Sequence, residues 1–108
     1  MDARRIDALL HEHLFRLPAG IGDGMPWHPE RYSTTWDGLG DVVAAMGGRG
    51  YQPTIARCSD HGRHPGMWWS IWHECPGTRT WDSYADTAPM AVALAALKAL
   101  GVKVDGDG

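Results

Sequence analysis

The sequence has 108 residues, of which 44% are hydrophobic and 21% are charged, with a formal net charge of −3. These values fit one globular domain with its own core and exclude an intrinsically disordered chain. The 13 acidic and 10 basic residues provide no clustered positive charge for a nucleic-acid backbone. No apolar run approaches the ~20 residues that cross a bilayer, and the N-terminus lacks a signal-peptide pattern. We therefore expect a cytoplasmic protein with reduced thiols and no membrane partner.

Two helices are predicted in the first half of the chain. Apolar residues at three- and four-residue spacings predict a helix over residues 2–16, which a Gly- and Pro-rich loop to residue 29 ends. Ser33, Thr34 or Thr35 is then expected to cap a second helix over residues 36–46. Its predicted apolar stripe consists of Trp36, Leu39, Val42, Val43 and Met46.

The spacing of apolar residues changes to two after the second helix. This alternation predicts strands over residues 51–58, 67–75 and 80–84, joined by connections rich in turn residues. Pro53 favours an edge position for the first of these strands, because proline offers no N–H to a neighbouring strand. The short connections predict an antiparallel meander.

A third helix is predicted over residues 90–100, with its start marked by Asp86-Thr87-Ala88-Pro89 and its end by Gly101. Its predicted buried side carries Ala93, Leu94, Leu97 and Leu100. The whole order predicts an α+β domain: a three-stranded antiparallel sheet with two N-terminal helices and one C-terminal helix, layered helix/sheet/helix. We expect a single domain over residues 1–104 and a flexible tail over residues 105–108.

Three segments of the chain carry a resemblance to a known family. These are RRIDALLHEHLF, PERYSTTWDGLGDVVAAM and YADTAPMAVALAALKALGV. With Tyr32-Ser33-Thr34 before the central helix and Ala85 to Leu100 at the end, the chain resembles the phage ABA sandwich domain family of small phage and prophage proteins. It departs from that pattern in a longer loop before Pro29 and in a His-rich insert between the first two strands. The resemblance implies a fold and a phage context, and it brings no catalytic residues.

The residue types that could bind a metal are Cys58, His61, His64, His73 and Cys75. In a hairpin, the end of the first strand faces the start of the second, so Cys58 is expected roughly 20 Å or more from His73 and Cys75. Zinc needs all its ligands within about 2.3 Å of one ion, and a disulfide needs Cα atoms within about 7 Å. We therefore predict no metal site, no cofactor and no Cys58–Cys75 disulfide, with a zinc-binding protein kept as an alternative.

A nucleophile–base arrangement can be drawn from Ser70, His73 and Asp82. The sequence supplies neither a nucleophile elbow nor a glycine-rich oxyanion turn beside them. We predict that the protein is not an enzyme.

The tryptophans of the second strand divide between the two faces of the sheet. Period-two geometry places Trp68, Ser70, Trp72 and Glu74 on one face, and Trp69, Ile71 and His73 on the other. Helices on both faces would bury both sets. If one face lacks a helix, its aromatic residues form an exposed patch of the kind that marks an interface.

These observations predict a non-catalytic phage or prophage accessory protein that binds a host or phage protein, or a second copy of itself. Inhibition of a host defence system, an anti-CRISPR-like role, is a specific hypothesis that rests on the phage context. The predicted protein-binding residues are Trp68, Trp72, Glu74, Asp60 and Asp82.

The alternative from another class is a module that binds RNA or single-stranded nucleic acid by stacking bases on the aromatic residues. The last helix begins with Asp86 and has Lys98 as its one basic residue, which disfavours this alternative.

Overall fold

The structure, a computed structural model, describes residues 3–15, 31–58 and 65–102. Its elements are α1 (Ala3–Leu10), a π-helix η1 (His11–Phe15) that continues it, α2 (Trp36–Gly47), β1 (Tyr51–Arg57), β2 (Trp68–Glu74), β3 (Thr80–Ala85) and α3 (Ala88–Ala99). The predicted α+β class and the order of helices and strands are confirmed. The tail predicted over residues 105–108 lies outside the described residues.

The three strands form one antiparallel sheet in the order β1-β2-β3. Tyr51 pairs with Glu74 and Arg57 with Trp68, while Trp68 also pairs with Ala85 of β3. The strand β1 is therefore an edge strand, as Pro53 predicted.

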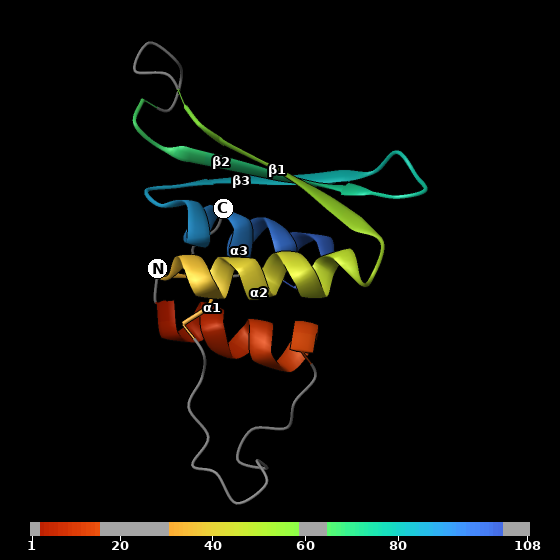
Figure 1. Cartoon of the computed structure of the whole chain (residues 1–108), viewed down its shortest axis with the longest axis horizontal. Helices are drawn as coiled ribbons and strands as arrows, with labels where there is room; N and C mark the ends of the chain where they lie inside the picture. The colour runs from red at the N-terminus through yellow and green to blue at the C-terminus, as the bar shows by residue number, and fades with distance from the viewer. Residues whose placement is uncertain (1–2, 16–30, 59–64, 103–108) are drawn as a thin grey trace, which may run out of the picture.

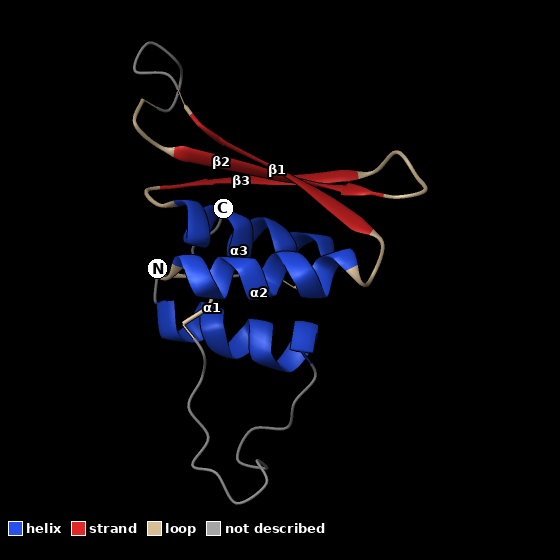
Figure 2. Cartoon of the chain, viewed as in Figure 1, coloured by secondary structure: helices blue, strands red, loops and turns tan. Residues whose placement is uncertain are grey.

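The layering differs from the predicted helix/sheet/helix order. Figure 1 and Figure 2 show α2 and α3 side by side on the same face of the sheet, with α1 beneath them. The reason lies in α3, in which every residue from Ala91 to Leu97 is buried. A helix that is apolar all round needs cover on every side. Here the sheet covers one side of α3, and α1 and α2 cover the others.

The centre of the core is Trp72, which is fully buried on the helix-covered face of β2. Its indole Nε1 donates a hydrogen bond of 3.2 Å to the backbone carbonyl of Val92 in α3. Beside it, Ser70 and Ser83 pair across β2 and β3 and are also buried. These small side chains let the alanines of α3 approach the sheet closely.

A buried carboxylate joins α1 to the segment before α2. Asp7 Oδ1 accepts hydrogen bonds from the backbone N–H of Ser33 at 2.8 Å and from its hydroxyl at 2.7 Å. Next to this contact, the ring of Tyr32 stacks on Phe15 with centroids 4.5 Å apart. The Tyr32-Ser33 pair therefore holds the helical layers together.

The cap of α2 is Thr35, whose hydroxyl accepts from Gly38 N–H at 2.9 Å. A Cβ at Gly38 would overlap the carbonyl oxygen of Arg31 and the Cα of Tyr32, so this weak helix former is required by a close backbone approach. Of the predicted apolar stripe, Leu39, Val42 and Met46 are buried, and Val43 is half-buried. Trp36 instead is 63% exposed.

Truncating Trp72 should remove much of the stability of the domain. We expect Trp72→Ala to lower the free energy of unfolding by about 3–5 kcal/mol, because it leaves a large cavity under α3. Trp69→Ala, on the uncovered side of the same strand, should cost about 1 kcal/mol. Urea denaturation followed by circular dichroism measures both. Equal losses for the two variants would contradict this assignment of faces, and Trp72→Phe provides a folded comparison if Trp72→Ala does not fold.

The Asp7–Ser33 contact gives a second stability prediction. Asp7→Ala leaves a buried N–H and a buried hydroxyl without their acceptor, at a cost of about 1–3 kcal/mol. Asp7→Asn keeps one acceptor oxygen and should cost less. Asp41→Ala, an exposed carboxylate on α2, is the matched control and should stay within about 0.5 kcal/mol of the wild type. The same denaturation experiment would refute the proposed contact if Asp7→Ala and Asp41→Ala behaved alike.

Candidate functional site

The face of the sheet away from α2 and α3 carries no helix among the described residues (Figure 1). We call it the open face. The register places its residues in three rows across the strands: Ala56, Trp69 and Tyr84; Thr54, Ile71 and Asp82; Gln52, His73 and Thr80.

Side-chain contacts fix the aromatic centre of the open face. Trp69 Nε1 donates a 3.1 Å hydrogen bond to Asp82 Oδ2, and His73 Nε2 lies 3.3 Å from the hydroxyl of Thr54. Trp69 and Ile71 are half-buried, and Tyr84 is 38% exposed. The open face therefore has an apolar centre with polar neighbours, one of which, Asp82, holds Trp69; an apolar centre with a polar surround is typical of protein-binding surfaces.

The structure corrects the predicted role of two tryptophans. Trp68 and Trp72 lie on the covered face, where Trp72 is fully buried and Trp68 packs against the core. Trp68 also meets Trp36 of α2 edge to face, with ring centroids 5.8 Å apart. The alternation of residues assigned the tryptophans of β2 to the correct faces, but it does not indicate which face of the sheet the helices cover. The aromatic residues on the open face are Trp69, which is half-buried, and Tyr84, which is 38% exposed.

The three acidic residues predicted to contact a partner have different positions in the structure. Asp82 lies on the open face, Asp60 lies outside the described residues, and Glu74 is already paired. The Glu74 carboxylate accepts two hydrogen bonds from Arg79, at 2.7 and 3.1 Å. These bonds, followed by the positive charge of Arg79, hold the pKa of Glu74 below its usual value of 4.5.

Both edges of the sheet carry features that hinder the addition of another strand. Pro53 interrupts the row of N–H donors along β1. On β3, Lys98 Nζ donates a 3.0 Å hydrogen bond to the backbone carbonyl of Asp82. Lysine and proline at sheet edges disfavour edge-to-edge pairing. The open face is therefore the better candidate for contact with a partner.

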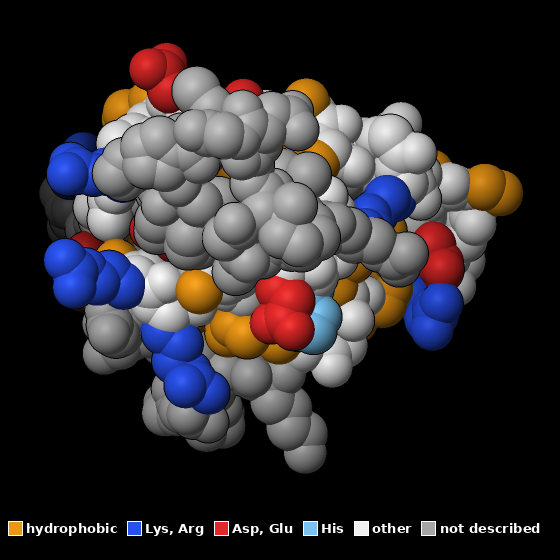
Figure 3. All heavy atoms as spheres, turned by 90° about the horizontal axis from the view of Figure 1, so that it is seen from below, with side chains coloured by type: hydrophobic (Ala, Val, Ile, Leu, Met, Phe, Trp, Pro, Cys, Tyr) orange, Lys and Arg blue, Asp and Glu red, His pale blue; other side chains and the backbone are white. Residues whose placement is uncertain are grey.

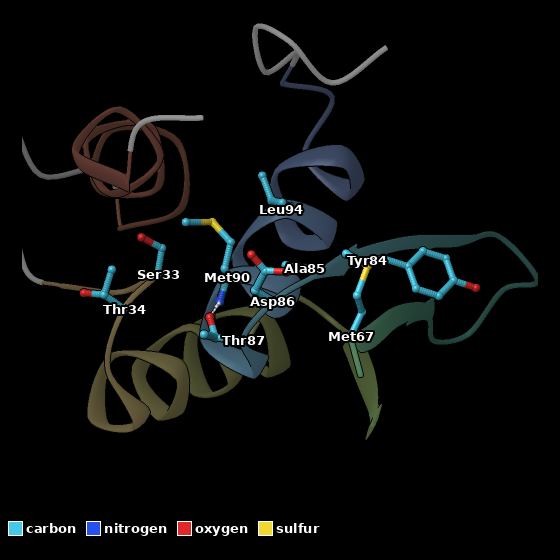
Figure 4. A pocket seen from close by; sticks show the side chains of 9 residues that line it. All are labelled: Ser33, Thr34, Met67, Tyr84, Ala85, Asp86, Thr87, Met90 and Leu94. Atoms are coloured by element: carbon cyan, nitrogen blue, oxygen red, sulfur yellow. Dashed lines mark hydrogen bonds between the residues drawn. The ribbon is translucent and has the colours of Figure 1, made fainter. Parts of the chain in front are cut away.

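A pocket of about 490 Å³ lies at one end of the sheet, open to solvent. Figure 4 shows its lining: Ser33 and Thr34 before α2, Met67 before β2, Tyr84 to Thr87 at the end of β3, and Met90 and Leu94 of α3. The ring of Tyr84 points away from the other lining side chains. Both motifs that carry the family resemblance contribute to this lining. Sequence analysis missed the pocket, because its residues come together only through the packing of α3.

The polar groups of the pocket differ in how they are used. The Ser33 hydroxyl is bonded to Asp7, and the Thr87 hydroxyl accepts from Met90 N–H at 3.4 Å as the cap of α3. Asp86 is exposed at the rim. The lining residues that the structure describes include no Lys, Arg or His. The described lining thus combines apolar walls with a negative rim.

Figure 3 views the molecule from the side of α1, opposite the sheet. Among the described residues, Lys and Arg side chains lie along the left edge of this view and at two places on the right, and hydrophobic side chains form separate small patches.

The candidate metal ligands are not assembled among the described residues. Cys58 N–H bonds to Met67 O at 2.7 Å, whereas Cys75 N–H bonds to Gly50 O at 2.8 Å, at the opposite end of the β1–β2 hairpin. Both thiols are free. His61 and His64 lie outside the described residues, and the described ones hold no group of three potential ligands. The triple of Ser70, His73 and Asp82 is likewise separated, because Ser70 lies on the covered face.

The fold is shared with a phage protein from Bacillus cereus ATCC 14579, known from a crystal structure at 2.0 Å. The two chains are 21% identical, with a TM-score of 0.78 over 97% of this chain and 93% of the other. At this identity the likeness establishes the fold alone. The sequence matches no protein-family model and no curated protein. Within the described part of the chain, no helix has the length and hydrophobicity to cross a membrane.

The Glu74–Arg79 pair predicts a pH-dependent contribution to stability. Because the pKa of Glu74 is lowered in the folded state, the stabilisation is present above the unfolded value of 4.5 and is lost as pH falls through the folded value. Wild type should therefore melt above Glu74→Gln at pH 7, and the difference should vanish near pH ~3. Thermal melts across this range test it. A difference in melting temperature that grows toward low pH would contradict the assigned pair.

Proposed function

We propose that the protein is a non-catalytic phage or prophage accessory protein that acts by binding another protein through the open face of its sheet. The observation that carries the proposal is the uncovered apolar centre formed by Trp69, Ile71 and Tyr84. Large, well-held aromatic side chains supply much contact area at little entropic cost, which is why they dominate binding energy in protein interfaces.

The charge of this face supports a protein partner over a nucleic acid. Its strand residues include the carboxylate of Asp82 and no Lys or Arg. Stacking of bases on Trp69 or Tyr84 would bring phosphates to strand residues that include no Lys or Arg, in a protein of net charge −3. A partner with apolar and basic groups at its surface fits better, since Asp82 can meet a positive charge.

The phage context rests on two supports. One is the fold shared with the Bacillus cereus phage protein, and the other is the resemblance of the Tyr32–Thr34 and Ala85–Leu100 motifs to a family of small phage proteins. We infer a host or phage protein as the partner. A narrower hypothesis is that the protein inhibits a host defence system of the CRISPR type by covering a functional surface of one component. This narrower role rests on the phage context alone.

Variants of the open face test the proposal. We expect Trp69→Ala combined with Tyr84→Ala to lower the recovery of specific partners at least tenfold in affinity capture from the infected host, because two aromatic side chains that contribute about 1–2 kcal/mol each are removed. Quantitative mass spectrometry measures the recovery. The narrower hypothesis expects a component of a defence system among the lost partners.

The matched control is Trp81→Ala, which removes a tryptophan from the covered side of the same strand β3. It should keep the partners that the double variant loses, provided that circular dichroism shows both proteins folded. Unchanged recovery with the folded double variant would refute the open face as the binding surface.

A further inference from the structure

We propose that the pocket at the start of α3 receives a lysine or arginine side chain of the protein partner. This inference rests on the proposed function, and it names the chemistry of the partner at a second point of contact. The pocket is close to the open face, because Tyr84 belongs to both: it lines the pocket and carries its ring on the open face beside Trp69. One partner can therefore reach both surfaces.

The walls of the pocket suit an aliphatic stem. Met67, Met90, Ala85 and Leu94 contribute apolar surface from three different elements of the fold. Methionine side chains adapt their shape to what they contact, and the stems of Lys and Arg pack well on apolar surfaces while their charged ends stay near water. A volume of about 490 Å³ has room for such a side chain.

The rim of the pocket suits a positive charge. The carboxylate of Asp86 is exposed there, and Figure 4 shows it between Met90 and Tyr84, whereas the hydroxyl of Thr34 is turned away from the other lining side chains. A carboxylate accepts hydrogen bonds but cannot donate them, so it selects ammonium or guanidinium groups over anions. The described lining residues include no cationic side chain that would neutralise Asp86.

The start of α3 does not compete as an anion site. A helix N-terminus attracts anions through its free N–H groups and its dipole. In α3, Met90 N–H is bonded to the Thr87 hydroxyl and Ala91 N–H to the Thr87 carbonyl, and Pro89 has no N–H. The negative charge of Asp86 precedes this turn and offsets the dipole. These features favour a cation in the pocket.

Methionine-methyl NMR of the full chain tests the inference without the partner. The probe is N-acetyl-lysine methylamide, compared with the norleucine and glutamate analogues. We expect the lysine probe to shift the methyl signals of Met67 and Met90 in a saturable way, while fully buried Met46 serves as the internal reference. The norleucine analogue should bind more weakly, and the glutamate analogue should leave the signals unchanged.

The role of the rim carboxylate is tested by Asp86→Asn, which should raise the Kd of the lysine probe about two- to fivefold. Asp41→Asn, an exposed carboxylate of α2 outside the pocket, is the matched control and should leave the Kd unchanged. Three results would overturn the inference: no shift of Met67 and Met90, equal binding of the glutamate analogue, or a Kd that does not depend on Asp86. Tighter binding of n-butylammonium than of the lysine probe would assign the pocket to a free amine and overturn it as well.

Failure of this inference can be separated from failure of the proposed function. The NMR titration reports on the pocket alone. Because Tyr84 also lines the pocket, the capture experiment includes the single variant Trp69→Ala, which changes the open face without changing the pocket lining. If the folded double variant of Trp69 and Tyr84 keeps its partners while the lysine probe binds in an Asp86-dependent way, the open face is refuted and the chemistry of the pocket stands.

Discussion

The fold depends on the burial of α3 on all sides. A helix made almost entirely of alanine, leucine and valine has no polar stripe to turn toward water, so it must be enclosed. The sheet encloses it from one side through Trp72, and α1 and α2 enclose it from the others. Everything else in the architecture follows from this requirement, including the position of all described helices on one face of the sheet.

The uncovered face of the sheet is a consequence of the same requirement. Because α1 and α2 are used to cover α3, neither is available to cover Trp69 and Ile71. A helix/sheet/helix layering would have buried these residues and left α3 partly exposed. In this fold, α1 and α2 cover the apolar helix α3 and leave the opposite face of the sheet uncovered. That face is therefore available for contact with a partner.

Much of the fold could be predicted from the sequence, because it depends on local patterns. Apolar periodicity placed all six helices and strands, Pro53 identified an edge strand, and Thr87 and Thr35 were among the capping candidates. The layering could not be predicted in this way. Alternation along β2 separates two faces without indicating which one meets a helix, so the sequence alone predicts Trp72 and not Trp69 as a contact residue.

The pocket and the Glu74–Arg79 pair could not be predicted from the sequence either, because both depend on tertiary structure. The pocket depends on the approach of residues 33–34, Met67 and α3, which lie far apart in the chain. The uniform composition of α3 did contain a usable signal. The sequence analysis predicts a single buried side for this helix. Alanines around its whole circumference instead indicate a helix at the centre of the fold.

The enclosure of α3 also bears on how the chain reaches its native state during synthesis. Of the described elements, α3 is the last to leave the ribosome, so the sheet and the N-terminal helices emerge before the element that they surround. Until then the apolar surfaces that α3 covers lack their native partner, and the contacts that α1 and α2 later make with α3 are distant in sequence. Folding must therefore wait for residues 88–99 to emerge. A ribosome that stalls earlier would leave an incomplete chain with exposed apolar surface, which chaperones and proteases of the cell recognise.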